Sequence, residues 1–468
     1  MTVISKIESI KRGHGSADRA LAGELWAADT FPDFPANREQ GNYDPTYDRI
    51  DYTRYYDPDY AREEHARVWM KSWILVCHES DIPAVGDRTP ISIGPVSFFV
   101  IRVEEDGFKA FYNSCTHRGT LLCGKTESGD GIRCPFHAWE WKNDGRLSYV
   151  PSHWDFKMVT PKNAALREVR VERWGGFLYI NADRQAPSLI ETLGVIPAHF
   201  EQFDLPNRYV AGHYRKTVKA NWKLTQEAFM ESYHVIGTHS NAIPFSGDTQ
   251  SQYDVYEDGV AHIGRQLTPG GHPSMHAASE VTTADAILGA ATFLRDMHHP
   301  GAPLPELDRT LPVRPQVAAW FRKLESERLG RACTLPDGLL LDSPLYFVFP
   351  QSTFWLSESL PFVYSFLPHE SDPEMSYMEV RMMKHHPVGT KRPAPAARID
   401  VAPEEKVFEL APVFGFLGAV FDQDFENLPN VQMGARSADP ERHYAQLGDY
   451  QEFVLKRFHE VLDEMMAD

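Results

Sequence analysis

The chain has 468 residues, of which 42% are apolar and 24% charged, which suits two or three globular domains. Its net charge of −18, without a cluster of Lys and Arg, excludes a nucleic-acid surface, because phosphate contacts need such clusters. There is no long apolar run and no apolar signal-peptide core, so we expect a soluble, cytoplasmic protein that does not bind a membrane. The 5 cysteines are too few, and odd in number, for a disulfide scaffold, which favours metal ligation where they cluster.

Residues 1–58 are rich in Asp, Tyr and Pro and carry no chemical motif, so we expect an N-terminal arm that packs on a larger domain. Helices are predicted at 20–28 and 60–71. Residues 72–103 alternate apolar and polar side chains between Pro and Gly breaks, which predicts strands. The runs 98–103 and 108–112 flank an acidic turn with glycine and are predicted to pair as a β-hairpin.

Two loops after this hairpin each carry one Cys and one His: Cys115-x-His117 and Cys134-x-x-His137. Glycines between the two halves allow the loops to face each other. Two thiolates and two imidazoles are the ligands of a Rieske [2Fe-2S] cluster, in which Cys binds one iron and His the other. A structural zinc ion takes the same ligand types, although zinc fingers usually pair Cys with Cys in each half. Cys123 lies outside this spacing and is predicted to be a small core residue.

Residues 221–239 are predicted to form a helix with an apolar face that carries Glu231, His234 and His239. Positions three apart share a helix face and positions five apart do not, so we expect the helix to loosen near Gly237 and return His239 to the site. Two imidazoles and a carboxylate on one side of a metal are typical of non-heme Fe(II) oxygenases. From the residues alone Glu231 is the nearest carboxylate, and an ordinary core helix is the alternative.

The remaining chain is predicted to form an antiparallel sheet with helices. Strands are predicted at 209–220, 346–356, 362–367 and 376–384, and helices at 284–297, 316–329 and 444–466. The segment between Pro269 and Pro336 is punctuated by Pro and Gly, and we interpret it as a lid, a pocket wall or a surface insertion.

The two metal-binding motifs, in this order and spacing, make the chain similar to the large (alpha) subunit of Rieske non-heme iron oxygenases, the ring-hydroxylating oxygenase family. The resemblance runs from about residue 66 to the C-terminus and includes WILVCHESDIP before the cluster motif and WGGFLYINAD behind it. It implies an α+β protein with an all-β Rieske domain and a catalytic domain whose antiparallel sheet is flanked by helices (helix-grip, START-like). We place the arm at 1–58, the Rieske domain at 59–180 and the catalytic domain at 181–468.

The resemblance also implies which residues bind iron. The [2Fe-2S] cluster would be held by Cys115, His117, Cys134 and His137, and the mononuclear Fe(II) by His234, His239 and Asp424. In this family the acidic ligand comes from near the C-terminus, where Asp424 fits best and Asp422 and Glu426 are the register alternatives.

Glu231 has a different implied role, as the residue that bridges the two metal centres for electron transfer. The commoner family residue at this position is Asp, and Glu occurs in some relatives that oxidise quaternary ammonium compounds such as carnitine. Its carboxylate would accept hydrogen bonds from His234 and from His137 of a neighbouring subunit. The resemblance therefore implies a homo-oligomer, a trimer, and leaves open whether beta subunits join it.

Together the motifs predict an oxygenase that uses O2 to hydroxylate a hydrophobic aromatic or polycyclic compound, once or as a cis-dihydroxylation, as in aromatic hydrocarbon catabolism. No dinucleotide-binding loop follows a predicted strand, so a separate NAD(P)H-oxidising reductase, with or without a ferredoxin, is expected to supply electrons. The alternative is a monooxygenase or demethylase acting on a quaternary ammonium, N-methyl or methoxy compound, and an aromatic cage would favour a cationic substrate. Outside this class are a di-iron carboxylate protein, which needs two Glu-x-x-His motifs, and an electron carrier without mononuclear iron.

Overall fold

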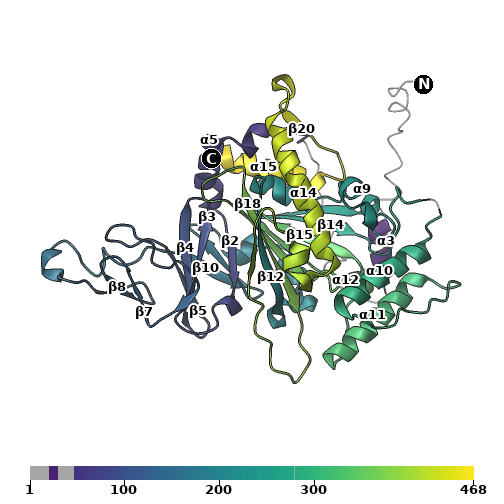
Figure 1. Cartoon of the computed structure of the whole chain (residues 1–468), viewed down its shortest axis with the longest axis horizontal. Coiled ribbons are helices and arrows are strands. Elements are labelled where there is room, and N and C mark those ends of the chain that lie inside the picture. Colours follow the sequence, from purple (N-terminus) through teal and green to yellow (C-terminus); the bar gives the residue numbers. More distant parts are fainter. Residues whose placement is uncertain (1–20, 30–46, 279, 468) are drawn as a thin grey trace.

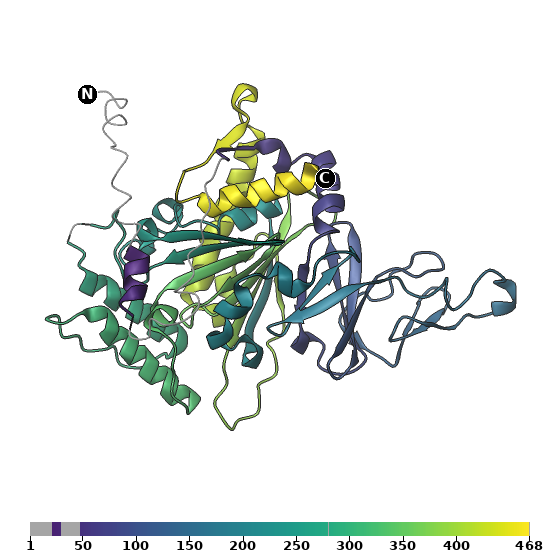
Figure 2. The ribbon, with the colours of Figure 1, turned by 180° about the vertical axis from the view of Figure 1, so that it is seen from behind.

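The computed structural model describes residues 21–29, 47–278 and 280–467 of the chain. Two large β-sheets lie side by side in it, and most helices gather around the sheet formed by the later part of the chain (Figure 1). A small three-stranded sheet projects from the earlier part and ends in a narrow tip (Figures 1 and 2). The predicted α+β class is confirmed, because an all-β body precedes a body of sheet and helices.

The first sheet has seven antiparallel strands in the order β2-β11-β10-β5-β4-β3-β6. Their bounds are β2 (Ile74–His78), β3 (Asp87–Ile93), β4 (Val96–Glu104), β5 (Gly107–Tyr112), β6 (Glu127–Ser128), β10 (Glu168–Trp174) and β11 (Phe177–Asn181). The predicted hairpin is β4 and β5, with Phe99 opposite Phe111. The projecting sheet consists of β7 (Gly131–Arg133), β8 (Glu140–Lys142) and β9 (Leu147–Tyr149).

The second sheet has eight strands in the order β13-β14-β15-β16-β17-β18-β12-β19, antiparallel throughout except for the β12–β19 pair. Their bounds are β12 (Tyr209–Val218), β13 (Gln252–Asp258), β14 (Ala261–Thr268), β15 (Ser343–Val348), β16 (Ser352–Trp355), β17 (Phe362–Pro368), β18 (Ser376–Lys384) and β19 (Ile399–Val401). The single strand predicted at 346–356 is wrong, because it is split into the β15–β16 hairpin. Pro350 lies in the turn between them, where its missing N–H costs the sheet no hydrogen bond.

Most helices gather around this second sheet (Figure 1). The helices from residue 58 onward are α5 (Pro58–Glu64), α6 (Leu189–Thr192), α7 (Ile196–His199), α8 (Trp222–Glu227), α9 (Val235–Thr238), α10 (Thr283–His298), α11 (Val313–Leu329), α12 (Asp337–Leu341), α13 (Val407–Leu410), α14 (Phe416–Arg436) and α15 (Phe453–Ala467). The helices predicted at 284–297 and 316–329 are confirmed as α10 and α11. Helix α14 packs across the sheet, with Phe421 against Tyr214 and Tyr364 (Figure 1).

The C-terminal helix starts later than predicted. Residues 444–452 were expected to be helical, yet the helix begins at Phe453. Tyr444–Gln446 form β20, which pairs with β1 (Arg49–Asp51) from the other end of the chain. A pairing over such a sequence distance leaves no local pattern, so the amphipathic stripe alone predicts a helix that begins too early.

The described part of the predicted arm contacts the helix-covered body. In α3 (Leu21–Ala27), the Trp26 indole N–H donates to Asp342 at 2.6 Å. The Asp29 carboxylate accepts the N–H groups of Asp337 and Gly338 at 2.7 Å each, which caps α12. Residues 1–20 and 30–46 of the arm lie outside the described residues. The domain boundaries placed after residues 58 and 180 stay predictions.

One apolar core runs through both bodies, from Val76 in β2 to Phe347 in β15. Polar contacts also join them, since Arg381 pairs with Asp81 at 3.3 Å and the Gln351 amide donates to the Leu75 carbonyl at 3.0 Å. The body that contains the seven-stranded sheet, from which the tip projects, is therefore anchored to the helix-covered body. In the part of the chain that the structure describes, every helix is too short or too polar to cross a lipid bilayer.

Candidate metal centres and cavity

Two short loops at the tip have the same backbone form. In the first, the Gly119 N–H donates to the Cys115 carbonyl at 2.9 Å, and in the second the Ala138 N–H donates to the Cys134 carbonyl at 3.1 Å. The fifth residue of each loop is left-handed, with φ of 80° at Gly119 and 56° at Ala138. Each loop thus turns sharply enough to present its Cys and its His on the same side.

The four predicted cluster residues meet at these loops. The rings of His117 and His137 lie 4.7 Å apart between centroids, and Nδ1 of His117 is buried without a hydrogen-bond partner among the described residues. Burial opposes ionisation of Cys134, but the backbone N–H groups of the residues after it donate to its sulfur and lower the pKa of the thiol. An orphaned ring nitrogen and a stabilised thiolate fit the donor set of a [2Fe-2S] cluster.

Aromatic packing holds one of these histidines in place. The indole of Trp139 stacks on the His117 ring at 4.8 Å with an interplanar angle of 2°, and Phe156 meets the same ring edge-on at 5.5 Å. The Arg118 guanidinium lies 5.6 Å from the centre of the Phe136 ring. Cys123 is 1% exposed in the apolar core of the tip, as predicted.

The segment 221–239, predicted as a helix that loosens near Gly237, is broken earlier, between α8 and α9, and Gly237 lies inside α9; the predicted position of the break is therefore wrong. The N–H groups of Phe229 and Met230 bond three residues back instead of four, which tightens and ends α8. Beyond this point the Ser232 N–H donates to the Tyr253 hydroxyl at 3.3 Å, a partner from the neighbouring sheet. Tertiary hydrogen bonds therefore replace the helical ones just before the metal-binding candidates.

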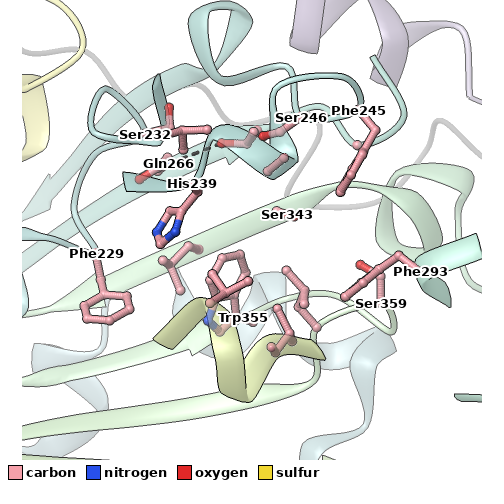
Figure 3. Close-up of a pocket in the computed structure, with 18 of the residues that line it drawn as sticks. Phe229, Ser232, His239, Phe245, Ser246, Gln266, Phe293, Ser343, Trp355 and Ser359 are labelled. Carbon is pink, nitrogen blue, oxygen red and sulfur yellow. Dashed lines mark hydrogen bonds between the residues drawn. The ribbon is translucent and has the colours of Figure 1, made fainter. Parts of the chain in front are cut away.

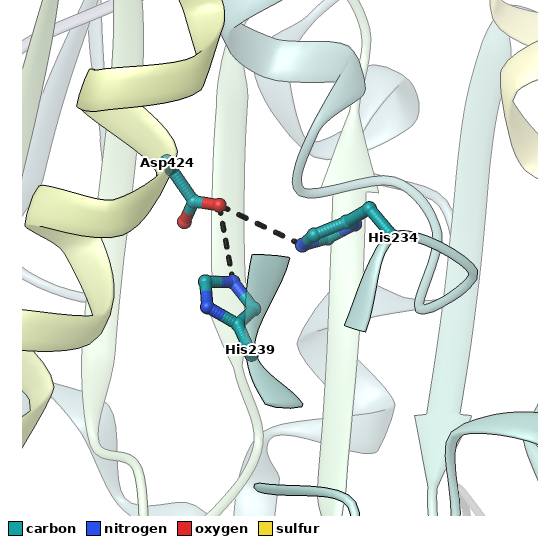
Figure 4. A group of neighbouring side chains, drawn as sticks. All are labelled: His234, His239 and Asp424. Atoms are coloured by element: carbon teal, nitrogen blue, oxygen red, sulfur yellow. Dashed lines mark ion pairs between the residues drawn. The ribbon is translucent and has the colours of Figure 1, made fainter. Parts of the chain in front are cut away.

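Three candidate ligands converge from this broken segment and from α14 (Figure 4). His234, His239 and Asp424 lie close enough to share a single ion, with ligand atoms within 4.8 Å of one another. Asp424 Oδ1 lies 3.0 Å from Nε2 of His239 and 3.7 Å from Nε2 of His234. Two imidazoles and one carboxylate fit the donor set of a mononuclear iron site.

Hydrogen bonds fix the orientation of both imidazoles. Nδ1 of His234 donates to Glu231 at 2.7 Å, and Nδ1 of His239 donates to the Gln423 amide oxygen at 2.8 Å. With Nδ1 occupied in each ring, Nε2 keeps its lone pair for a metal. Burial by itself lowers the pKa of His234, but the Glu231 carboxylate outweighs burial and raises it to about 9. A proton therefore competes with the metal for this ring.

The two register alternatives to Asp424 have other partners. Asp422 accepts the two backbone N–H groups at the start of α13, at 2.8 and 3.0 Å. Glu426 is exposed and pairs with Lys406 at 3.2 Å. Gln423 was missed by sequence reasoning, since nothing in the sequence distinguishes it from a solvated glutamine; the rotation of α14 turns it toward His239.

A cavity of about 230 Å³ lies beside this centre. Figure 3 shows His239 and Phe229 at one end and Phe293 and Ser359 at the other. Its apolar lining comprises Ala228, Phe229, Val235, Ala242, Phe245, Ala290, Phe293, Leu294, Leu341, Leu345, Trp355, Leu360, Tyr364, Phe416, Leu417, Val420 and Phe421. Neither Lys nor Arg is among the described residues that line it, and its carboxylates are those of Glu231 and Asp424.

The two centres lie far apart within one chain. The tip around β7 and β8 projects beyond one side of the seven-stranded sheet, whereas α9 and α14 lie on the other side of it (Figures 1 and 2).

Two family models match the chain. The Rieske [2Fe-2S] domain matches residues 72–160, and the ring hydroxylating alpha subunit (catalytic domain) matches residues 198–468. The chain belongs to the ring-hydroxylating alpha-subunit family. The predicted resemblance is thereby confirmed, and with it the two iron cofactors that these domains bind.

Curated relatives include both kinds of oxygenase. The carnitine monooxygenase oxygenase subunit of Escherichia coli (strain K12) is 33% identical over 40% of this chain and 50% of its own length. The naphthalene 1,2-dioxygenase large oxygenase component of Pseudomonas putida is 31% identical over 40% of this chain and 43% of its own length. The chain thus aligns with about half the length of these relatives.

Solved structures share the fold over nearly the whole chain. A quaternary ammonium Rieske monooxygenase matches with a TM-score of 0.62 at 17% identity, covering 93% of this chain and 98% of that one. A naphthalene 1,2-dioxygenase mutant bound to phenanthrene matches with a TM-score of 0.63 at 18% identity, covering 90% and 93%. Both domains therefore have their counterparts in the same order.

Proposed function

We propose that the chain is the oxygenase component of a Rieske non-heme iron oxygenase that hydroxylates a hydrophobic aromatic or polycyclic compound, once or as a cis-dihydroxylation. The observation that carries this proposal is the placement of His234, His239 and Asp424 at one end of an apolar cavity. When bound, the mononuclear iron supplies O2 activation and the [2Fe-2S] cluster supplies electrons one at a time.

The chain's own residues have distinct tasks in this proposal. Glu231 and Gln423 hold the two imidazoles in the tautomer that leaves Nε2 free. Asp424 contributes negative charge, which offsets part of the charge of a divalent ion. The aromatic walls bind an apolar ring next to this centre and exclude water from it.

For the cluster we propose Cys115, His117, Cys134 and His137 as ligands. Acid-labile sulfide in the purified chain distinguishes a [2Fe-2S] cluster from a structural zinc ion held by the same ligand types. His117→Ala in the full chain should bleach the visible spectrum of the cluster; an unchanged spectrum would remove His117 from the ligand set.

Electron transfer is proposed to run between copies of the chain, with Glu231 as the bridge to the cluster of a second copy. The remoteness of the tip from the iron site within one chain supports this route. Exposed apolar side chains occur at both places, Phe136 and Trp154 at the tip and Tyr233 and Ile236 beside Glu231. A homotrimer, with or without beta subunits, would bury them.

Electrons are proposed to come from a separate NAD(P)H-oxidising reductase, with or without a ferredoxin, in the cytoplasm. The sequence carries no dinucleotide-binding loop after a predicted strand, which supports a separate partner.

The charged groups of the cavity lining help to decide between a quaternary ammonium substrate and a neutral aromatic one. Relatives named for carnitine and glycine betaine favour a quaternary ammonium substrate, and both of those molecules also carry a carboxylate. A buried carboxylate needs a cationic or hydrogen-bonding partner, and neither Lys nor Arg is among the described residues of the lining. The rings of Phe229, Tyr364 and Phe421 pack on one another at 5.5 to 6.2 Å, as a wall and not as a cage around an empty centre. These observations favour a neutral aromatic substrate.

The test is a substrate screen with a surrogate reductase, measuring NADH-coupled O2 uptake and product mass for neutral arenes, carnitine and glycine betaine. A gain of two oxygens and two hydrogens on an arene supports dihydroxylation, and a gain of one oxygen supports monohydroxylation. Turnover of carnitine or glycine betaine with none of the arenes would contradict the proposal. A chain with cluster iron, no mononuclear iron and no O2 uptake would be an electron carrier.

A further inference from the structure

The cavity beside the iron site has two chemically different walls. Gln266 and Ser232 lie on one side, and Phe229 and Trp355 lie on the other (Figure 3). A flat ring bound between them would stack on the aromatic wall and turn its other face or an edge toward the polar one. An engineered cavity of about 150 Å³ holds benzene, so about 230 Å³ is enough for a fused bicyclic ring.

Most hydroxyl groups on the polar wall already have partners. Ser232 Oγ donates to a backbone carbonyl at 3.0 Å and lies 2.9 Å from the Tyr253 hydroxyl. Thr268 Oγ1 lies 2.7 Å from the Ser251 hydroxyl and accepts the Gln266 amide N–H at 3.2 Å. Neither hydroxyl can turn to a ligand without giving up an existing hydrogen bond.

Gln266 differs because half of its amide is unused. The side chain is 7% exposed, and its Oε1 has no hydrogen-bond partner among the described residues. An unpaired buried amide oxygen is costly, so a donor on a bound molecule would be favoured there. A hydroxyl group suits this position best, because it donates to Oε1 and would also accept from the amide if O and N were exchanged.

The charged groups of the cavity lining restrict the class of ligand further. The two carboxylates of the lining, Glu231 and Asp424, are engaged with the iron-site histidines. An ionised group on the ligand would enter an apolar cavity without a counter-charge at its far end, where Phe293 and Ser359 lie. The hydrogen-bonding group should therefore be neutral.

We propose that Gln266 is a specificity-determining residue that selects neutral aromatic molecules carrying a hydroxyl group, by accepting the hydrogen bond of that hydroxyl at Oε1. The proposal rests on the proposed function only in taking this cavity as the substrate site. Gln266 and Trp355 together would hold such a ring between a hydrogen bond and an aromatic face.

The test is equilibrium binding of 2-naphthol and naphthalene to the full chain with both iron centres loaded, under anaerobic conditions and without reductase. The two probes differ by one hydroxyl, so the ratio of their Kd values isolates its contribution. Gln266→Leu should reduce the relative preference for 2-naphthol about five- to tenfold, the effect of one hydrogen bond. Gln266→Met, with an unbranched side chain of similar length, should do the same if Gln266→Leu folds poorly.

Gln226→Leu is the matched control, because Gln226 is also fully buried with unpaired amide atoms but does not line this cavity. It should leave the Kd ratio at the native value. An unchanged ratio in both Gln266 variants, or an equal change in Gln226→Leu, would overturn the proposal. Failure of the proposed function would show separately, as absent O2 uptake with either bound probe in the complete system while the Kd ratio still depended on Gln266.

Discussion

Two aspartates lie two positions apart on α14, and replacing each of them with alanine should impair a different property of the protein. Asp424→Ala removes a carboxylate that is 4% exposed and lies beside both iron-site histidines. Asp422→Ala removes a carboxylate that is 7% exposed and accepts two backbone N–H groups at the start of α13. The first change acts on metal binding and the second on the stability of the fold.

The expected magnitudes follow from these contacts. Loss of a group that merely orients a metal ligand weakens metal binding about 10- to 100-fold, so loss of Asp424 itself should weaken it by at least about 100-fold. Loss of Asp422 leaves one buried and one part-buried N–H group without an acceptor, which should cost about 2 kcal/mol. In a domain of this size that lowers Tm by a few degrees.

The assay is iron content, visible spectrum and Tm of each purified variant after gel filtration. Asp424→Ala should hold one iron fewer than the native chain, with an unchanged cluster spectrum. Asp422→Ala should keep the native iron content and have a lower Tm than the native chain. Loss of iron from Asp422→Ala with full retention in Asp424→Ala would refute the assignment of the ligand and the helix register on which it depends.

Three further changes probe neighbouring features. Glu231→Gln should keep both iron centres yet lose most steady-state turnover, because the bridging charge is gone; near-native turnover would remove the bridging role. Gln423→Leu frees Nδ1 of His239 and should weaken mononuclear iron binding about 10- to 100-fold, measured by chelator competition, with the cluster spectrum as control. Burial lowers the pKa of His298 from 6.5 to about 4, so as pH falls below 6.5 only the unfolded chain takes up this proton and stability is lost. At pH 5 the loss is about 2 kcal/mol, and His298→Gln should reduce the difference in Tm between pH 7 and pH 5; an equal difference in both proteins would contradict this.

Local patterns were sufficient for the elements whose hydrogen bonds are local. The hairpin of β4 and β5 and helices α10 and α11 lie close to their predicted positions. Prediction was wrong where a distant partner decides the backbone, as at Tyr444–Gln446, which pairs with a strand near the N-terminus. The break before Ser232 has the same origin, because the hydrogen-bond acceptor there is Tyr253 of β13.

The sequence by itself determined the two kinds of metal centre. The spacing of cysteine and histidine within a short loop fixes which ligand atoms that loop can offer to a metal, and this spacing does not depend on tertiary contacts. The family follows from the same motifs.

The family resemblance favours Asp424 among three acidic residues on one helix, and only the tertiary structure brings its carboxylate beside His234 and His239. Successive positions on a helix are rotated by 100°, so a shift of two places turns a carboxylate to nearly the opposite side, and packing of α14 on the sheet sets which side faces the histidines. The same packing turned Gln423 toward His239 and set the lining of the cavity, in which neither Lys nor Arg is among the described residues. These contacts join residues far apart in the chain, and no local pattern encodes them.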